Sequence, residues 1–179
     1  MKIYTAKGDQ GKTSLLFGAR ISKSNLVIEC LGCLDELNSF LGLAKAVVKS
    51  ASFKKLIHKL QTDIYVISSE IAAKSENLNK LAIRFRKKRL LWLEKEINNL
   101  ALKAKFKSCC FFVAGSNFPS AILDVCRTVC RRAERKLVFL NCKAKIKNQV
   151  ILAYLNRLSS LLFVLVRAFE KKHKKFPSL

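Results

Sequence analysis

The sequence predicts an all-α protein: a five-helix bundle with a short irregular segment at its N-terminus. Half of the 179 residues are apolar, which is enough for a hydrophobic core, and a chain of this length forms one domain. Only 6 glycines and 2 prolines interrupt the chain, so long helices are favoured over many short strands and turns. Apolar residues recur at helical spacing in five segments with modest connections between them, which is typical of a bundle.

Each predicted element follows from a local pattern. The first 28 residues show no sustained helical period and include a polar loop with two glycines. Beyond them, apolar residues recur every three or four positions, and this predicts helices over about 30–48, 53–73, 87–103, 119–141 and 147–172. Pro119 suits the first turn of the fourth helix. The single domain therefore consists of an N-terminal loop (1–28), a helical bundle (29–172) and a basic tail (173–179).

The net charge of +23 is the extreme feature of the composition. Such a charge suggests a polyanionic partner, either nucleic acid or an anionic membrane. The excess lies in lysine-rich pieces at predicted helix ends and connections, without the interleaved aromatic residues that stack on bases. We therefore predict a generally basic surface and no specific nucleic-acid partner.

The longest apolar run, Val150 to Phe169, is interrupted by Asn156 and Arg157. An arginine near the centre of a membrane costs about 3 kcal/mol, so this run is predicted to be a buried core helix. Residues 1–11 are polar and lack the apolar stretch of a signal peptide. We expect a cytoplasmic protein that does not span a membrane.

Seven cysteines, an odd number, lie mostly within apolar runs. Cys30 and Cys33 form a lone C-x-x-C, whereas a zinc site usually needs four ligands in two close pairs. The two histidines, His58 and His173, are isolated. Reduced core cysteines are therefore predicted, and no metal site on the protein itself.

The stretch RTVCRRAER, residues 127–135, is the densest functional signal. Residues three and four apart share a helix face, so Arg127, Arg131, Glu134 and Arg135 form a polar stripe about 12 Å long. Arginine is suited to fork-shaped recognition of phosphate, so the stripe predicts a polyanion held in fixed geometry. A solvated face with Glu–Arg pairs explains this segment equally well. The predicted core face comprises Ile122, Val125, Cys126, Val129, Ala133, Leu137 and Leu140.

The segment TAKGDQGKTS, residues 5–14, is the second dense signal. Its glycines let the backbone approach an anion, and its lysines supply positive charge. A relaxed Walker A pattern ends at Gly11, Lys12 and Thr13. A P-loop needs a buried strand before it and a helix directly after it, and neither is predicted here. We therefore predict a phosphate-binding loop of another architecture.

Six segments in order carry a family resemblance: IYTAKGDQGKTSLLFGARISK (3–23), LGCLDELNSFLGLA (31–44), LQTDIYVISSEIA (60–72), LLWLEKEI (90–97), RTVCRRAER (127–135) and YLNRLSSLLFVLVR (154–167). Together they resemble the helical-bundle family of ATP:cob(I)alamin adenosyltransferases, the kind that includes the propanediol-utilisation and human mitochondrial enzymes. The resemblance extends over essentially the whole chain.

This resemblance implies a homotrimeric five-helix bundle with ATP bound between neighbouring subunits. The implied reaction transfers the 5′-deoxyadenosyl group of ATP to the cobalt of reduced cobalamin and releases triphosphate. Mg²⁺ accompanies the ATP, and a cob(II)alamin reductase is an expected partner. Cobalt(I) is itself the nucleophile, so no catalytic Ser, Cys or His is expected.

The resemblance also implies the site residues. The ATP loop comprises Thr5, Ala6 through its backbone alone, Lys7, Gly8, Asp9, Gly11, Thr13 and Ser14. Further nucleotide contacts are implied for Lys23, Arg131, Arg132, Ala133, Glu134, Arg135 and Asn156. The implied catalytic group is Asp35, Arg127, Arg131 and Phe111. Within it Asp35 pairs with Arg127, a pair that could also simply tie the first helix to the fourth, and Phe111 occupies the lower face of the corrin.

Three departures from the family pattern affect the corrin side more than the ATP side. The segment FFVAGSN, residues 111–117, lacks a proline and one glycine that the family usually has. Asp124 stands where histidine is common, and the connection before Trp92 is lysine-rich where relatives are often acidic. The altered loop keeps a second hypothesis open, that of a non-catalytic ATP- or cobalamin-binding carrier or sensor with the same bundle.

Overall fold

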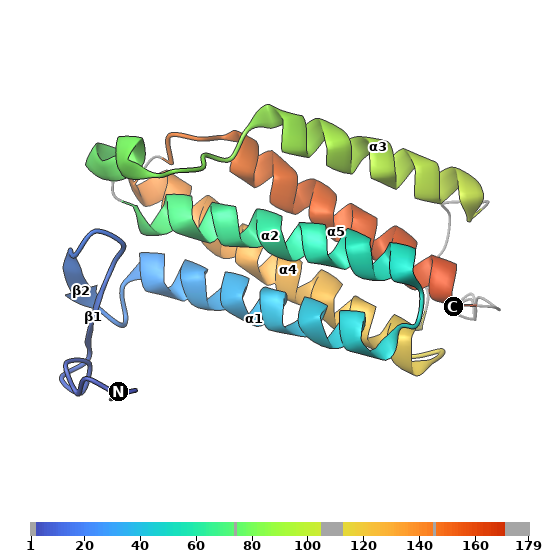
Figure 1. Cartoon of the computed structure of the whole chain (residues 1–179), viewed down its shortest axis with the longest axis horizontal. Coiled ribbons are helices and arrows are strands. Elements are labelled where there is room, and N and C mark those ends of the chain that lie inside the picture. The colour runs from blue at the N-terminus through green and yellow to red at the C-terminus, as the bar shows by residue number, and fades with distance from the viewer. Residues whose placement is uncertain (1–2, 74, 105–112, 145, 171–179) are drawn as a thin grey trace, which may run out of the picture.

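The structure is a computed structural model that describes residues 3–73, 75–104, 113–144 and 146–170. In these ranges the chain forms the predicted all-α bundle, preceded by a two-stranded hairpin (Figure 1). The helices are α1 (Leu26–Val47), α2 (Ala51–Ala72), α3 (Lys87–Lys103), α4 (Phe118–Ala144) and α5 (Val150–Phe169). The hairpin strands are β1 (Lys12–Ser14) and β2 (Arg20–Ser22), and a 3₁₀ helix, η1, covers Ser75–Lys80.

Helix α4 lies between two neighbours, since it packs against both α1 and α5. Helix α2 packs on α1, and α3 packs on α5 at the outside of the bundle, as Figure 1 shows. The α4 residues on the core face are buried as predicted, with one exception. Val125 is 39% exposed, because it lies at the edge of the apolar face where α4 meets solvent. The prediction that Val125 belongs to the core is therefore wrong.

Asp63 joins three helices in the core. It lies on α2 and is fully buried, accepts a hydrogen bond from the Tyr154 hydroxyl of α5 (2.8 Å), and pairs with Arg89 of α3. A buried carboxylate is tolerated only when it is paired and hydrogen-bonded, and both conditions hold here. Burial, with the adjacent Asp63 carboxylate as a second cause, raises the pKa of Tyr154 well above its usual value, so the hydroxyl stays a donor.

Residues 12–22 form a hairpin that the sequence analysis missed. Strand β1 pairs antiparallel with β2, with Thr13 opposite Ile21. Gly18 has φ +91°, a conformation that L side chains rarely adopt, so glycine is suited to this turn. Leu15 is buried and anchors the hairpin at the end of the bundle where α1 begins (Figure 1). The short irregular N-terminal segment that the sequence predicts therefore contains a small hairpin.

Capping explains why α1 begins earlier than predicted. The side chain of Asn25 accepts a hydrogen bond from the Val27 N–H at 2.9 Å, which satisfies one of the free donors at the helix start. Helix α4 begins in a similar way, because Asn117 Oδ1 accepts from the Ser120 N–H at 3.0 Å. Side chains therefore cap the first turn of both helices, α1 just after the hairpin and α4 more than two turns before Arg127.

Helix α5 is the one helix of the described residues that is long and apolar enough to cross a membrane by length and composition. In the fold, however, 61% of its most apolar window is buried inside the bundle. The prediction of a buried core helix is thus confirmed, and the structure shows that this helix packs against both α3 and α4.

Candidate active site

The loop before β1 presents its polar groups to solvent. Thr5, Lys7, Asp9 and Ser14 are exposed, and backbone bonds from Asp9 N–H to Ala6 C=O (3.2 Å) and from Gly11 N–H to Gly8 C=O (3.2 Å) fold the loop on itself. The Arg20 side chain donates to the Lys7 carbonyl at 2.8 Å and ties the loop to the hairpin. The loop therefore offers cationic and hydroxyl side chains on a backbone with defined turns.

Lys23 connects this loop to the helical bundle. A Cβ atom at Gly8 would lie 3.2 Å from the Lys23 ammonium, so the absence of a side chain at Gly8 allows this close approach. Lys23 also lines a cavity of about 370 Å³ together with Gly32 and Cys33 of α1 and Arg132 of α4. Lys23 thus lies between the N-terminal loop and Arg132 of α4.

Arg132 lies on the flank of α4 that faces α1. It forms an ion pair with Glu36 of α1, and one turn later Lys136 pairs with Glu29 at 3.1 Å. The hydrogen bond with Glu36 raises the pKa of Arg132, so its guanidinium remains charged. Glu36 was not singled out from the sequence, although it follows Asp35 directly in the segment that resembles the family.

Arg127 and Arg131 lie on the other flank of α4, which faces α5. They line a cavity of about 440 Å³ with Ser159, Ser160 and Phe163 of α5, closed by two residues of α3. On the same flank the Asn156 amide donates to Glu134 at 2.9 Å. Arg135 is exposed to solvent between the flanks. The predicted stripe is therefore present for Arg127, Arg131 and Glu134, whereas Arg132 serves a separate cavity.

Asp35 and Arg127 do not meet within the chain. Asp35 is exposed and lines a groove of about 420 Å³ between α1 and α2, beside Tyr65 and Ser68. Arg127 instead pairs with Asp124 of its own helix, with Nε and Oδ1 2.7 Å apart. The alternative in which the Asp35–Arg127 pair ties α1 to α4 is therefore wrong within one chain. A contact between two chains stays a prediction.

Two other predicted residues differ from the rest. Ala133 is 1% exposed and packs in the core, so its side chain is not available to a ligand. Phe111, predicted to lie beneath the corrin, is outside the described residues.

Asp124, Ser159 and Ser160 border the candidate site and were not predicted as parts of it. The spacing of Asp124 three residues before Arg127 could have indicated their contact.

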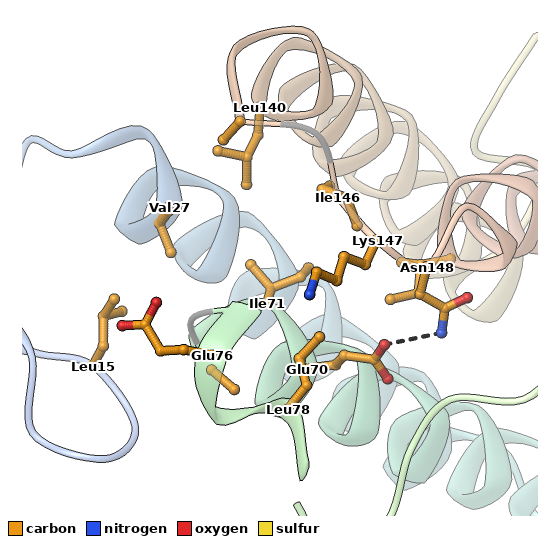
Figure 2. A pocket seen from close by; sticks show the side chains of 13 residues that line it. Leu15, Val27, Glu70, Ile71, Glu76, Leu78, Leu140, Ile146, Lys147 and Asn148 are labelled. Atoms are coloured by element: carbon orange, nitrogen blue, oxygen red, sulfur yellow. Dashed lines mark hydrogen bonds between the residues drawn. The ribbon is translucent and has the colours of Figure 1, made fainter. Parts of the chain in front are cut away.

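A further cavity, of about 320 Å³, lies at the hairpin end of the bundle (Figure 2). Side chains from the hairpin, α1, α2, α4 and the segment before α5 converge on it, among them Leu15, Val27, Ile71, Leu140 and Ile146. The buried carboxylate at its edge, Glu70, is fully engaged with Arg84 (2.9 Å), the Phe85 N–H (2.9 Å) and Asn148 (3.0 Å). These residues pack together at the end of the bundle. None of the arginines of α4 lines this cavity.

Glu70 is a structural carboxylate. Burial alone would raise its pKa, but hydrogen bonds from Arg84, the Phe85 N–H and Asn148 outweigh burial and lower the pKa. The charged form is therefore the one that the fold favours, and it links α2 to the connection before α3 and to the start of α5.

The geometry thus gives two cavities on the two flanks of α4. Arg127 and Arg131 line one of them, and in the other, beside the N-terminal loop, Lys23 and Arg132 face Glu29 and Glu36. A model of the cobalamin adenosyltransferase family matches residues 3–169. A corrinoid adenosyltransferase of Citrobacter freundii is 35% identical over 170 residues, which cover 94% of this chain and 95% of that protein. A cobalamin adenosyltransferase of Cupriavidus metallidurans is 37% identical over 174 residues, covering 95% and 89%.

Among solved structures, a variant of the PduO-type ATP:corrinoid adenosyltransferase from Lactobacillus reuteri, complexed with cobalamin and ATP, superposes with a TM-score of 0.90. The two chains are 26% identical, and the superposition covers 99% of this chain and 100% of that one. With matches this complete in both sequence and fold, the chain belongs to the cobalamin adenosyltransferase family.

Proposed function

We propose that this protein transfers the 5′-deoxyadenosyl group of ATP to the cobalt of reduced cob(I)alamin, giving adenosylcobalamin and free triphosphate. The observation that carries the proposal is the pair of cavities on the two flanks of α4, each of which contains arginine side chains. Lys23 and Arg132 line one, beside the N-terminal loop, and Arg127 and Arg131 line the other. Relatives named corrinoid adenosyltransferases, and a structural neighbour complexed with cobalamin and ATP, support the catalytic activity over a carrier or sensor.

The chemistry requires alignment and charge stabilisation from the protein. A bond forms between cobalt and C5′ as the bond between C5′ and the α-phosphate oxygen breaks, and triphosphate leaves with that electron pair. Arginine and lysine side chains stabilise the charge that develops on the leaving group. Cobalt(I) supplies the nucleophile, so the side chains need only hold C5′ in line with it.

The buried cysteines are poorly suited to act as nucleophiles themselves. Burial raises the pKa of Cys30 to about 11 and that of Cys126 to about 12, so both thiols are protonated at neutral pH. Burial raises the pKa of Cys130 further. This supports a reaction in which no protein thiol attacks the nucleotide.

We assign the ATP loop and Lys23 to one side of the nucleotide. The ATP loop comprises residues Thr5 to Ser14, whose hydroxyl, lysine and backbone N–H groups contact the phosphates and the ribose. Lys23 contacts the nucleotide from the end of the bundle next to this loop. Arg131, Glu134 and Asn156 form the opposite side, supported by their position on the flank of α4 that faces α5. Arg132 and Arg135 complete the phosphate contacts.

Two chains are needed to bring these sides together. The α1 flank and the α5 flank are separated by the helix itself, so one ATP contacts both only if they come from neighbouring copies. A cyclic assembly places the same two surfaces at every junction, and we propose a homotrimer. In this assembly Asp35, exposed in its own chain, pairs with Arg127 of the next chain, and Phe111 occupies the lower face of the corrin.

Mg²⁺ fits this site as a companion of ATP. No group of three or more His, Cys, Asp or Glu side chains that could hold a metal ion occurs among the residues the structure describes. Mg²⁺ characteristically keeps several waters and binds through substrate phosphates with few protein carboxylates, and it would neutralise phosphate charge here. We place the enzyme in the cytoplasm, with a cob(II)alamin reductase supplying the reduced corrinoid.

An anaerobic assay tests this function. Purified protein with ATP, Mg²⁺ and cobalamin under a strong reductant should convert the cob(I)alamin spectrum to that of adenosylcobalamin, with triphosphate released in equal amount. Omission of ATP should abolish the change. If well-folded assembled protein gives neither product, the proposed reaction is wrong. Tight corrinoid binding without turnover would instead indicate the carrier.

A further inference from the structure

We propose that Asp124 is a positioning residue for the reaction, which acts by holding the guanidinium of Arg127. The inference rests on the proposed function, because it assigns a task to Arg127 in that reaction. Asp124 precedes Arg127 by three residues on α4, and its Oδ1 accepts a hydrogen bond from the Arg127 Nε at 2.7 Å. A charged donor and a charged acceptor at this distance form a strong hydrogen bond.

The contact is fixed in a partly buried place. The side chains of Arg127 and Asp124 are 27% and 17% exposed, so solvent competes less with this pair than with the open pair Lys136–Glu29, at 40% and 53%. Three-residue spacing on a helix lets the two side chains meet without distortion of the backbone. Asp124 therefore restricts the rotamers of Arg127 before any ligand or partner chain is present.

The bonded atom determines what remains available. Asp124 engages Nε, and the two terminal nitrogens of Arg127 have no hydrogen-bond partner among the described residues. These nitrogens form the bidentate edge that pairs with a carboxylate or phosphate. Asp124 thus holds the Arg127 guanidinium at Nε. The edge formed by the two terminal nitrogens of Arg127 stays free for Asp35 of a neighbouring chain.

Arg131 gives Asp124 a second task. It lies one turn after Arg127 and lines the same cavity, so two like charges face each other at a spacing that is unfavourable on a helix. The negative charge of Asp124, which is paired with Arg127, offsets the repulsion between Arg127 and Arg131. It thereby lets Arg131 turn toward the triphosphate while Arg127 stays directed toward the junction between chains.

The test is a set of substitutions at Asp124 measured in the full assembled enzyme. Asp124→Asn should lower kcat about tenfold, the loss expected for one hydrogen bond to a charged group, and Asp124→Ala somewhat more. Asp124→Glu should recover most of the activity, because glutamate at this spacing also reaches arginine. The KM for ATP should change less than about twofold in all three, since Asp124 does not itself contact phosphate.

Two controls isolate positioning from folding. Glu96→Gln removes a carboxylate from α3 that does not line the cavity of Arg127 and Arg131, and should leave kcat at the wild-type value. In an Arg127→Gln background, Asp124→Asn should cause less than about a twofold further loss, because the partner of Asp124 is already absent. An equal tenfold loss in that background, or wild-type kcat for Asp124→Ala, would overturn the assignment.

A measurement independent of activity separates this inference from the proposed function. In wild-type protein the Arg127 Nε–H signal in NMR should exchange slowly with water, and Asp124→Ala should abolish that protection. If wild-type protein makes no adenosylcobalamin, the proposed function fails, and so does the catalytic role of Asp124. If the enzyme is active but the Nε–H of Arg127 exchanges equally fast in both proteins, only the positioning by Asp124 is refuted.

Discussion

Arg131 is the single residue on which the proposed triphosphate contact depends most. It lines the cavity beside Ser159 and Ser160, and its side chain is exposed enough to meet a ligand. Arg131→Ala should lower kcat roughly 100-fold or more, as expected when a preorganised donor to a leaving group is removed. The substitution removes an exposed side chain, so the thermal midpoint should be nearly unchanged.

Lys143→Ala is the matched control for Arg131→Ala. It removes an exposed cation from the same helix, three turns farther on, near Phe139. Steady-state kinetics with ATP and reduced cobalamin should show wild-type turnover for this variant. Near-normal turnover of Arg131→Ala would instead refute the assignment of Arg131 to triphosphate.

At the scale of elements, Glu70 joins α2 to the connection before α3 and to the start of α5. Its folded-state pKa is lowered below the ordinary value of 4.5, so the ionised form stabilises the fold. That stabilisation is present above the unfolded-state pKa and is lost as the pH falls through the folded-state pKa. Glu70→Gln should therefore cost about 2 kcal/mol of unfolding free energy near pH 7 and progressively less in acid.

Urea unfolding at fixed protein concentration measures this difference, since the proposed assembly would make the apparent stability concentration-dependent. Glu76→Gln changes an exposed carboxylate of the same region and should cost little at any pH. A constant difference between wild type and Glu70→Gln from neutral pH into acid would contradict the role given to the Glu70 charge.

At the scale of the whole molecule, the two flanks of α4 predict complementation between inactive chains. In the proposed site Lys23 contacts one side of the nucleotide and Arg131 the other, and the two residues come from different copies of the chain. Chains carrying Lys23→Ala and chains carrying Arg131→Ala should each be inactive alone. When they are co-expressed with different tags, each trimer that contains both chains should regain about a third of the wild-type sites, that is, one junction of its three.

Turnover of the doubly purified mixed assembly checks this prediction. The control is a mixture of the two variants after separate purification, assayed before subunits can exchange. This mixture should stay inactive. If the mixed assembly is no more active than that control, the nucleotide site lies within one chain, and the proposed arrangement of the subunits is wrong.

Helices were predictable because their signal is local. The bounds of α3 agree with the prediction, and the core face of α4 was recognised except at Val125, which lies at its solvent edge. The hairpin was missed because its strands, KTS and RIS, are too short for an apolar alternation to appear. Its pairing depends on backbone hydrogen bonds between residues 12–14 and 20–22, which the side-chain pattern does not encode.

The sequence alone was enough to establish the all-α class, the order of the helices and the family resemblance, and it predicted phosphate binding for the loop and the arginine helix. These follow from periodicity and from motifs within single segments. The division of the arginines depends on the tertiary structure, which places Arg132 beside Glu36 of α1 on one flank of α4, and Arg127 and Arg131 in a cavity against α5 on the other. The physical reason is that a helix presents consecutive residues about 100° apart, and the packing of α1 and α5 on α4 determines which partner each side chain meets.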